Sequence, residues 1–168
     1  NVFVINNREN LLNNIIGGNV DGVIIFVDRW IDNEIIETMK KMSIRSVFLD
    51  RELDDLVMKS VTFDSYQTGY DAAQYLLSLG NMNIVYINGI NSMYDNVERY
   101  EGYIDAMSRA GLKGTTSKII DGYFEEKTSF LEVEKYLKNN QEKLPDAFLA
   151  ANDLSAIGAI KAINAVGL

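Results

Sequence analysis

The chain has 168 residues, of which 47% are hydrophobic and 24% charged, a composition typical of one globular domain or of two small lobes. It contains no cysteine and no histidine, which excludes disulfide bonds, cysteine-ligated zinc and any catalytic dyad or triad that needs an imidazole. The 16 basic and 24 acidic residues give a net charge of −8, and such an acidic surface repels phosphate backbones, so we do not expect this segment to bind nucleic acid by itself.

Short β-rich runs alternate along the chain with amphipathic segments of helical length. The runs cover residues 2–5, 22–26, 46–49, 60–63, 84–87, 118–120 and 147–150. Most of them are continuous stretches of Val, Ile, Leu and Phe, a pattern typical of strands that are covered on both faces. The predicted helices cover residues 33–42, 66–79, 96–110, 128–139 and 153–166, and three of them are closed by glycines, Gly80, Gly111 and Gly167.

This alternation predicts an α/β fold with parallel sheets, right-handed crossovers and helices on both faces. The segment between Ile5 and Val20 has room for barely two helical turns, which is short for a crossover of about a dozen residues. No apolar run reaches the length of about 18 residues that a membrane-spanning helix needs, and no signal-peptide pattern opens the chain. Because the chain opens directly in a β-rich run and stops just after a helix, we expect a fragment of a longer polypeptide.

The residues that follow the predicted strands share a chemistry. In an open parallel sheet, ligands bind beyond the carboxyl ends of the strands, because loops and helix N-termini converge there. Carboxylates, amides, an arginine and aromatic side chains hydrogen-bond hydroxyl groups and stack on an apolar ring face, so we interpret this edge as a pocket for a polyol or sugar. The residues are Phe26, Asp28, Arg29 and Trp30, then Asp50 and Arg51, then Asn88, Gly89 and residues 91–99, then Asp121, Gly122, Tyr123 and Phe124, and finally Asn152 and Asp153.

Each of these residues also has a purely structural interpretation. Asn152 or Asp153 can cap the helix that follows. Arg99 lies one turn after Asp95 and can form an exposed ion pair with it. Asp50 opens a charged segment typical of a solvated turn. Core packing is the alternative for two aromatic residues, Phe26 and Phe124, and a surface anchor is the alternative for Trp30.

Motifs for other chemistries are absent from the sequence. GxxxxGK[ST] and GxGxxG do not occur, and no acidic stretch matches a calcium-binding loop, so we expect neither a nucleotide cofactor nor a metal. The spacing of the carboxylates singles out no pair for acid–base work. An enzyme on a doubly wound sheet, with a glycosidase-like carboxylate pair, stays open as an alternative.

Several motifs, taken in chain order, resemble the effector-binding core of the LacI/GalR family of bacterial transcriptional regulators, which shares its fold with periplasmic sugar-binding proteins. The resemblance covers nearly the whole chain. Its more specific patterns are R-x-x-G-Y at residues 99–103 and A-x-N-D-x-x-A-x-G at residues 150–158. The other matching segments are DGVII at residues 21–25, SVFLDR at 46–51, SVTFDS at 60–65, IVYING at 84–89 and DGYF at 121–124.

The resemblance implies two Rossmann-like lobes of the periplasmic-binding-protein type, incomplete in this chain, with the effector bound in the cleft between them. Residues 1–63 correspond to the N-terminal lobe and residues 64–168 to the C-terminal lobe. At the matching positions, Asp50, Arg99 and Asn152 contact the effector and Phe124 stacks on it. Two further residues match pocket-lining positions that vary between relatives, Phe26 and Asp95.

The resemblance also implies a function. A small-molecule effector, a sugar or sugar derivative, shifts the affinity for operator DNA of a helix-turn-helix domain that is absent from this chain. The regulator is expected to be a cytoplasmic homodimer, with no enzymatic activity and no membrane contact. The alternative within the same fold is the sugar-binding protein of an ABC transport system, which needs an export signal in place of the DNA-binding domain.

Overall fold

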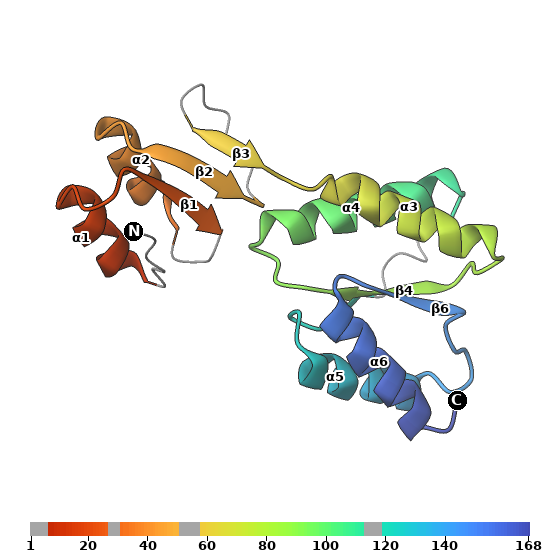
Figure 1. The fold of residues 1–168 in the computed structure, drawn as a ribbon. Helices are drawn as coiled ribbons and strands as arrows, with labels where there is room; N and C mark the ends of the chain where they lie inside the picture. Colours follow the sequence, from red (N-terminus) through yellow and green to blue (C-terminus); the bar gives the residue numbers. More distant parts are fainter. Residues whose placement is uncertain (1–6, 27–30, 51–57, 113–118) are drawn as a thin grey trace. The chain divides into compact units, whose positions relative to one another are not determined.

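The computed structural model describes residues 7–26, 31–50, 58–112 and 119–168. The chain divides into two compact units, Asn1–Phe63 and Asp64–Leu168, each built around its own three-stranded parallel sheet (Figure 1). The α/β architecture with parallel sheets, predicted from the alternation of runs and helices, is confirmed. No helix in the described part of the chain combines the length and the apolar character needed to cross a membrane.

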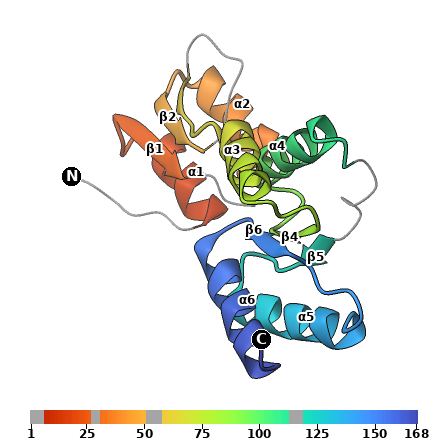
Figure 2. The same cartoon turned by 90° about the vertical axis from the view of Figure 1, so that its right-hand side faces the viewer.

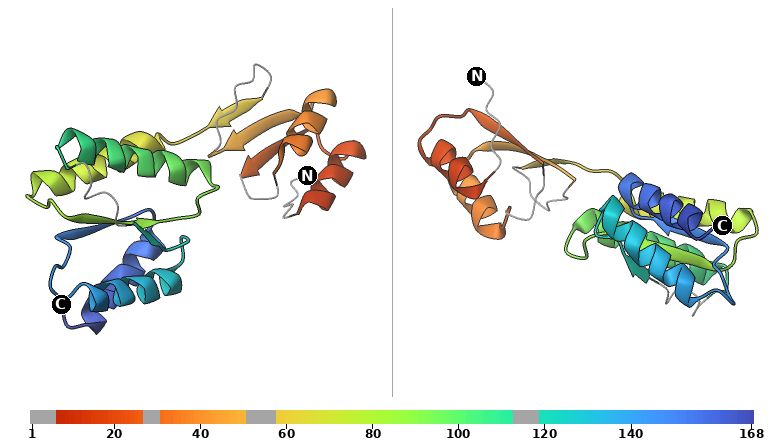
Figure 3. Two further views of the ribbon diagram at one scale, coloured as in Figure 1. Left: turned by 180° about the vertical axis from the view of Figure 1, so that it is seen from behind. Right: turned by 90° about the horizontal axis from the view of Figure 1, so that it is seen from below.

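In its described residues, the first unit has the sheet order β1-β2-β3 and two helices. Its elements are α1 (Arg8–Ile16), β1 (Gly22–Phe26), α2 (Asn33–Lys41), β2 (Arg45–Leu49) and β3 (Lys59–Val61). Both helices begin at a side-chain cap, because the Asn7 side chain accepts the N–H of Asn10 and the Asp32 side chain accepts that of Ile35, each at 2.9 Å. Apolar residues of α1 and α2 pack with β1 and β2 in one core (Figure 3).

The second unit has the sheet order β5-β4-β6, with helices on both faces (Figures 1 and 2). One core lies between the sheet and the pair α3 and α4, and another lies between the sheet and the pair α5 and α6. The elements are α3 (Ser65–Ser78), β4 (Ile84–Asn88), α4 (Tyr94–Arg109), β5 (Ile119–Asp121), α5 (Glu126–Asn139), β6 (Ala147–Ala150) and α6 (Asp153–Ala165).

The prediction that the apolar strands are covered on both faces is confirmed for β4 and is wrong for two edge strands, β1 and β5. Every residue of β4 is buried, since it is the central strand between two helical layers. In β1, by contrast, Ile25 is buried but the neighbouring Ile24 is 76% exposed. In β5, Ile120 is buried between the exposed Ile119 and Asp121. An apolar edge strand therefore has the same sequence pattern as a strand covered on both faces, although one of its faces is open in the described structure.

The predicted element boundaries lie within two residues of the observed ones for the five predicted helices. The strands at residues 22–26 and 147–150 are reproduced, while residues 2–5 and Lys118 lie outside the described residues. The segment considered too short for a crossover contains α1, which needs only nine residues. Gly80 follows α3 with φ of 90°, the left-handed conformation expected of a closing glycine.

Two glycines bring α3 and α4 into backbone contact. A Cβ atom added at Gly69 would lie 1.9 Å from the carbonyl oxygen of Arg99, and one added at Gly102 would lie 2.0 Å from that of Tyr66. Neither position can hold a side chain without moving a helix, because the clashing atoms belong to the main chain. This contact therefore fixes the position of α4, and with it the position of Arg99.

We predict that Gly102→Ala destabilises the protein by about 2 kcal/mol, because the added methyl group forces α3 and α4 apart. The measurement is urea unfolding followed by circular dichroism. The sign of this stability change is informative, because alanine in a helix interior is by itself more stable than glycine by about 1 kcal/mol. Glu101→Ala, at the neighbouring exposed position of α4, should change stability by less than about 0.5 kcal/mol. A stabilised Gly102→Ala variant would show that the two helices are not in contact.

Asp146 joins the beginnings of β4 and β6. Its carboxylate accepts the backbone N–H groups of Met82 and Asn83 at 2.8 and 2.7 Å. These hydrogen bonds, from Asn83 first and then from Met82, hold the pKa of Asp146 below its usual value of 3.8. Because the folded pKa is lowered, the stabilisation is present above pH 3.8 and is lost as the pH falls through the folded pKa.

We predict that Asp146→Asn lowers the melting temperature at pH 7 and that this difference from wild type shrinks below pH 3.8. Melting curves between pH 3 and pH 7 measure it. Glu142→Gln, a substitution of another exposed acidic residue in the same loop, serves as the control. It should change neither the melting temperature at pH 7 nor the dependence of the melting temperature on pH. A melting difference that is independent of pH would contradict the role assigned to the Asp146 carboxylate.

Candidate functional site

The strands of the second unit end side by side at one edge of the sheet. Asn88 at the end of β4 lies opposite Asp121 at the end of β5, and Ile87 lies opposite Ala150 at the end of β6. The loops after the strands are bonded back to the sheet, since the Gly122 N–H donates to Asn88 and the Ala151 N–H to Ile87, both at 2.9 Å. Within this unit, therefore, the residues after the strands meet at one edge.

Arg99 connects α4 to the end of β6. One terminal nitrogen of its guanidinium donates to the carbonyl oxygen of Ala151, and the other lies 3.5 Å from the carboxylate of Asp95. The Arg99 and Asp95 side chains are 22% and 30% exposed, so this is a partly buried ion pair rather than the exposed one considered from the sequence. The guanidinium is thus held next to Asn152 by one hydrogen bond and one ion pair within the chain, and it keeps further N–H groups for other partners.

Asn152 has a structural role at this edge. Its Oδ1 accepts the N–H of Ser155 at 2.9 Å, which confirms the predicted helix cap for this residue. Its Nδ2 donates to the carbonyl oxygen of Phe124 at 3.2 Å. An amide nitrogen carries two N–H groups, and this bond uses one of them, so capping and ligand contact are compatible in the same side chain.

Phe124 lies in a strained turn. Tyr123 and Phe124 have φ values of 55° and 64°, in the left-handed region that costs a side-chain-bearing residue about 1–2 kcal/mol. The Phe124 ring packs over Gly89, where an added Cβ atom would lie 2.2 Å from two ring carbons. The ring is half-buried against the core of α3 and α4, so the core alternative holds for one side of it. Such strain is typical of ligand-binding segments.

A chain of asparagine amides orders the loop after β4. Its residues are among those named after the predicted strand, but their bonds to one another were not predicted. The buried Asn96 accepts the N–H of Gly89 at 2.8 Å and donates to Asn88 Oδ1 at 2.9 Å. Asn88 in turn donates to Asn91 at 2.5 Å and to Asp121 at 3.4 Å. The sequence signal was an asparagine that ends the apolar strand, Asn88, followed by Asn91 and Asn96. Beneath this loop, burial raises the pKa of the Tyr86 phenol, which stacks with Tyr103.

Two predicted site residues belong to the first unit. Phe26 ends β1 and Asp50 follows β2, and since Phe26 lies opposite Leu49, both belong to the carboxyl edge of that sheet. Phe26 is 70% exposed, so its core alternative is wrong in the described structure. Asp50 has a φ of 61° and its N–H donates to Val61 at 3.0 Å. The remaining candidates lie outside the described residues: Asp28, Arg29, Trp30 and Arg51.

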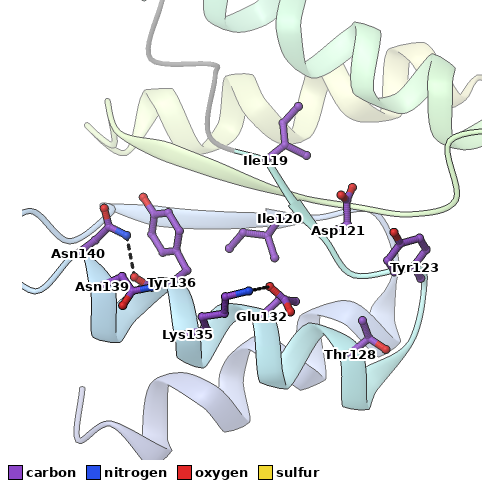
Figure 4. A pocket seen from close by; sticks show the side chains of 10 residues that line it. All are labelled: Ile119, Ile120, Asp121, Tyr123, Thr128, Glu132, Lys135, Tyr136, Asn139 and Asn140. Atoms are coloured by element: carbon purple, nitrogen blue, oxygen red, sulfur yellow. Dashed lines mark hydrogen bonds and ion pairs between the residues drawn. The ribbon is translucent and has the colours of Figure 1, made fainter.

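An open pocket of about 460 Å³ lies on the outer side of β5 (Figure 4). Of the candidate residues that follow the predicted strands, only Asp121 and Tyr123 line it. Its polar groups largely satisfy one another, since Lys135 pairs with Glu132 at 3.1 Å and the Asn140 side chain donates to the Tyr136 carbonyl at 2.8 Å. We therefore place the candidate site at the strand ends. In the described residues, no group of three acidic side chains is arranged to hold a metal ion.

The chain is similar to proteins of one family. Residues 5–168 match the family described as periplasmic binding protein domain. The HTH-type transcriptional repressor PurR of Pasteurella multocida is 31% identical over 166 residues, which cover 97% of this chain and 49% of that protein. Two solved structures, each 26% identical, match 95% of this chain. They are a sugar-binding LacI-family transcriptional regulator from Escherichia coli complexed with phosphate (TM-score 0.82, 57% of its chain) and the CelR–cellobiose complex (TM-score 0.81, 48% of its chain).

The chain therefore belongs to the periplasmic binding protein domain family. Its resemblance to the effector-binding core of LacI/GalR regulators is confirmed, since regulators of this kind are among its relatives in both sequence and structure. The chain spans about half the length of the curated relatives it matches.

We predict that Asn152→Ala and Asn152→Asp separate the two roles of this side chain. Alanine removes the cap and the bond to Phe124, and should lower the free energy of unfolding by about 1–2 kcal/mol. Aspartate keeps the cap but has no donor for the Phe124 carbonyl, so stability should stay closer to wild type while amide exchange in residues 122–125 accelerates. Urea unfolding and hydrogen exchange measure the two effects. Unchanged exchange in Asn152→Asp would contradict the restraint on the Phe124 turn.

Proposed function

We propose that this chain is the effector-sensing part of a LacI/GalR-type transcriptional regulator, with a sugar or sugar derivative as its effector. The observation that carries the proposal is the arrangement of Arg99, Asn152 and Phe124, which are linked at one edge of the second sheet through the Ala151 and Phe124 carbonyl groups. A guanidinium and an amide beside a half-buried aromatic ring suit a compound with hydroxyl groups and an apolar ring face.

In this proposal, the first unit is the N-terminal lobe and the second unit is the C-terminal lobe, with the effector bound between them. Asp50 supplies a carboxylate from the first lobe and Phe26 an apolar wall. From the second lobe, Arg99 and Asn152 donate hydrogen bonds to hydroxyl groups, Phe124 covers the ring face, and Asp95 orients Arg99. The ion pair of Asp95 with Arg99 supports this last assignment.

The effector regulates by preferring one arrangement of the two lobes. Only a difference in affinity between arrangements can shift their populations, so the effector must contact both lobes. A coupling of about 1–3 kcal/mol changes the affinity of an attached DNA-binding domain about 5- to 150-fold. The relative named as an HTH-type repressor supports a readout through operator DNA, bound by a domain outside these 168 residues.

The regulator acts as a cytoplasmic homodimer in this proposal, because two DNA-binding domains held at a fixed spacing read two half-sites. It has no enzymatic activity of its own, and its reported relatives are regulators rather than enzymes. The same relatives favour a regulator over the sugar-binding protein of an ABC transport system, although the fold serves both.

Substitution of Arg99 tests the proposal. A thermal-shift panel of sugars, nucleobases and amino acids should yield at least one sugar that raises the melting temperature. Arg99→Ala should then weaken binding of that sugar at least tenfold in calorimetry, since a hydrogen bond from a charged donor is worth about 1.5–3 kcal/mol. Hits confined to nucleobases or amino acids would contradict a sugar effector.

Arg109→Ala is the matched control. Arg109 is also on α4 and also pairs with a carboxylate one turn earlier, Asp105 at 2.9 Å, but it lies at the other end of the helix. This variant should bind the sugar as wild type does. Arg99→Lys retains the charge while losing the planar fork, so it separates loss of geometry from loss of charge. Wild-type affinity in Arg99→Ala would leave Arg99 with only its structural ion pair.

A further inference from the structure

We propose that the effector of this protein is uncharged, and that sugar phosphates and sugar acids are rejected by the carboxylates around the strand ends of the second unit. This inference rests on the proposed function and adds the charge of the ligand to it. Three features of the described residues support it. The Arg99 guanidinium is paired with the Asp95 carboxylate, the first turns of three helices carry acidic residues, and neutral amides are among the other donors at this edge.

Arg99 is already paired with a carboxylate of the chain itself. Its guanidinium is shared between the Asp95 carboxylate at 3.5 Å and the Ala151 carbonyl group. The pair is partly buried, where an incoming phosphate or carboxylate has to compete with Asp95 and then lies beside it without full solvent screening. A hydroxyl group has no such cost, because it can accept from Arg99 while Asp95 stays in place.

The helices that begin at this edge carry carboxylates in their first turns. A helix N-terminus attracts anions through its free N–H groups and its dipole. Here the first turns of α4, α5 and α6 each carry an acidic residue, Asp95, Glu126 and Asp153 respectively. Glu126 is bonded to Lys161 at 2.6 Å, and the exposed Lys127 follows it. Lys161 balances the charge of Glu126, so the carboxylates that oppose a negatively charged ligand here are those in the first turns of α4 and α6.

Other polar groups at the edge include neutral amides and one more carboxylate. Asn91 and Asn152 present amides, which donate to and accept from hydroxyl groups equally well. Asp121 lies opposite Asn88 and accepts from it at 3.4 Å, with its side chain exposed. Phosphate accompanies the Escherichia coli relative, so the fold by itself does not exclude an anion. In this chain the exclusion comes from its own carboxylates.

Matched pairs of ligands test the inference by calorimetry. The pairs are D-glucose with D-glucose 6-phosphate, D-ribose with D-ribose 5-phosphate, and cellobiose with cellobionate. In wild type, the neutral member of any pair that binds should bind at least about tenfold more tightly than the charged member, because like charges are juxtaposed in the charged complex. Asp95→Asn should reduce the ratio of these two affinities about tenfold, because it removes the carboxylate that pairs with Arg99 and lies in the first turn of α4.

Inorganic phosphate supplies a second readout that does not depend on the identity of the sugar. Wild type should show no melting-point rise in phosphate beyond that in chloride of equal ionic strength, whereas Asp95→Asn should show one. Glu134→Gln is the control, because Glu134 pairs with Lys138 at 2.9 Å in the same i,i+4 geometry on α5, away from the strand ends. It should respond as wild type does in both assays.

The outcomes separate the two proposals. A charged member that binds wild type as tightly as its neutral partner, or a phosphate-dependent rise in wild type, overturns the uncharged effector and leaves the sensing function standing. An Asp95→Asn variant without any gain in anion binding overturns the role assigned to the Asp95–Arg99 pair. Absence of binding by every sugar, charged or neutral, overturns the proposed function together with this inference.

Discussion

The contact between α3 and α4 is the constraint on which the candidate site depends. At Gly69 the neighbouring atom is the carbonyl oxygen of Arg99 itself, so the position of this residue is set by backbone packing rather than by its side chain. From that position the guanidinium reaches the carbonyl of Ala151, just after β6. The candidate site therefore depends on a close approach of α3 and α4 that only glycine allows, and the polar contacts of Arg99 follow from that approach.

The residues proposed for the site also hold the structure together. Asn152 caps α6 and restrains the turn of Phe124, and Arg99 bonds to Asp95 and to the chain after β6. These bonds offset the cost of the left-handed conformations at Tyr123 and Phe124. The structural and functional interpretations of such residues are consequently not exclusive. A pocket wall that is bonded before the ligand arrives loses less conformational freedom on binding.

The alternation of apolar runs and helices predicts the elements of this chain well, because periodicity and closing glycines are local properties. Strand ends also indicate the correct edge for Arg99, Asn152 and Phe124 in the second unit, since parallel strands all end on one side. What sequence cannot supply is the left-handed turn at Phe124, which depends on the distant Asn152 and Gly89. Nor does it supply the exposure of Phe26, because an apolar edge strand and a central strand have the same local pattern.

The difference between the two units at their strand ends bears on how an effector can regulate. In the second unit the donors are held by an amide chain, a partly buried ion pair and a helix cap, all formed within the unit itself. A ligand bound to that half alone has the same affinity in every arrangement of the lobes and shifts nothing. In the proposed mechanism, the regulatory difference must therefore come from the contacts that Asp50 and Phe26 add from the first unit. We propose accordingly that the second unit determines which ligand is accepted, and that the first determines whether its binding changes the lobe arrangement.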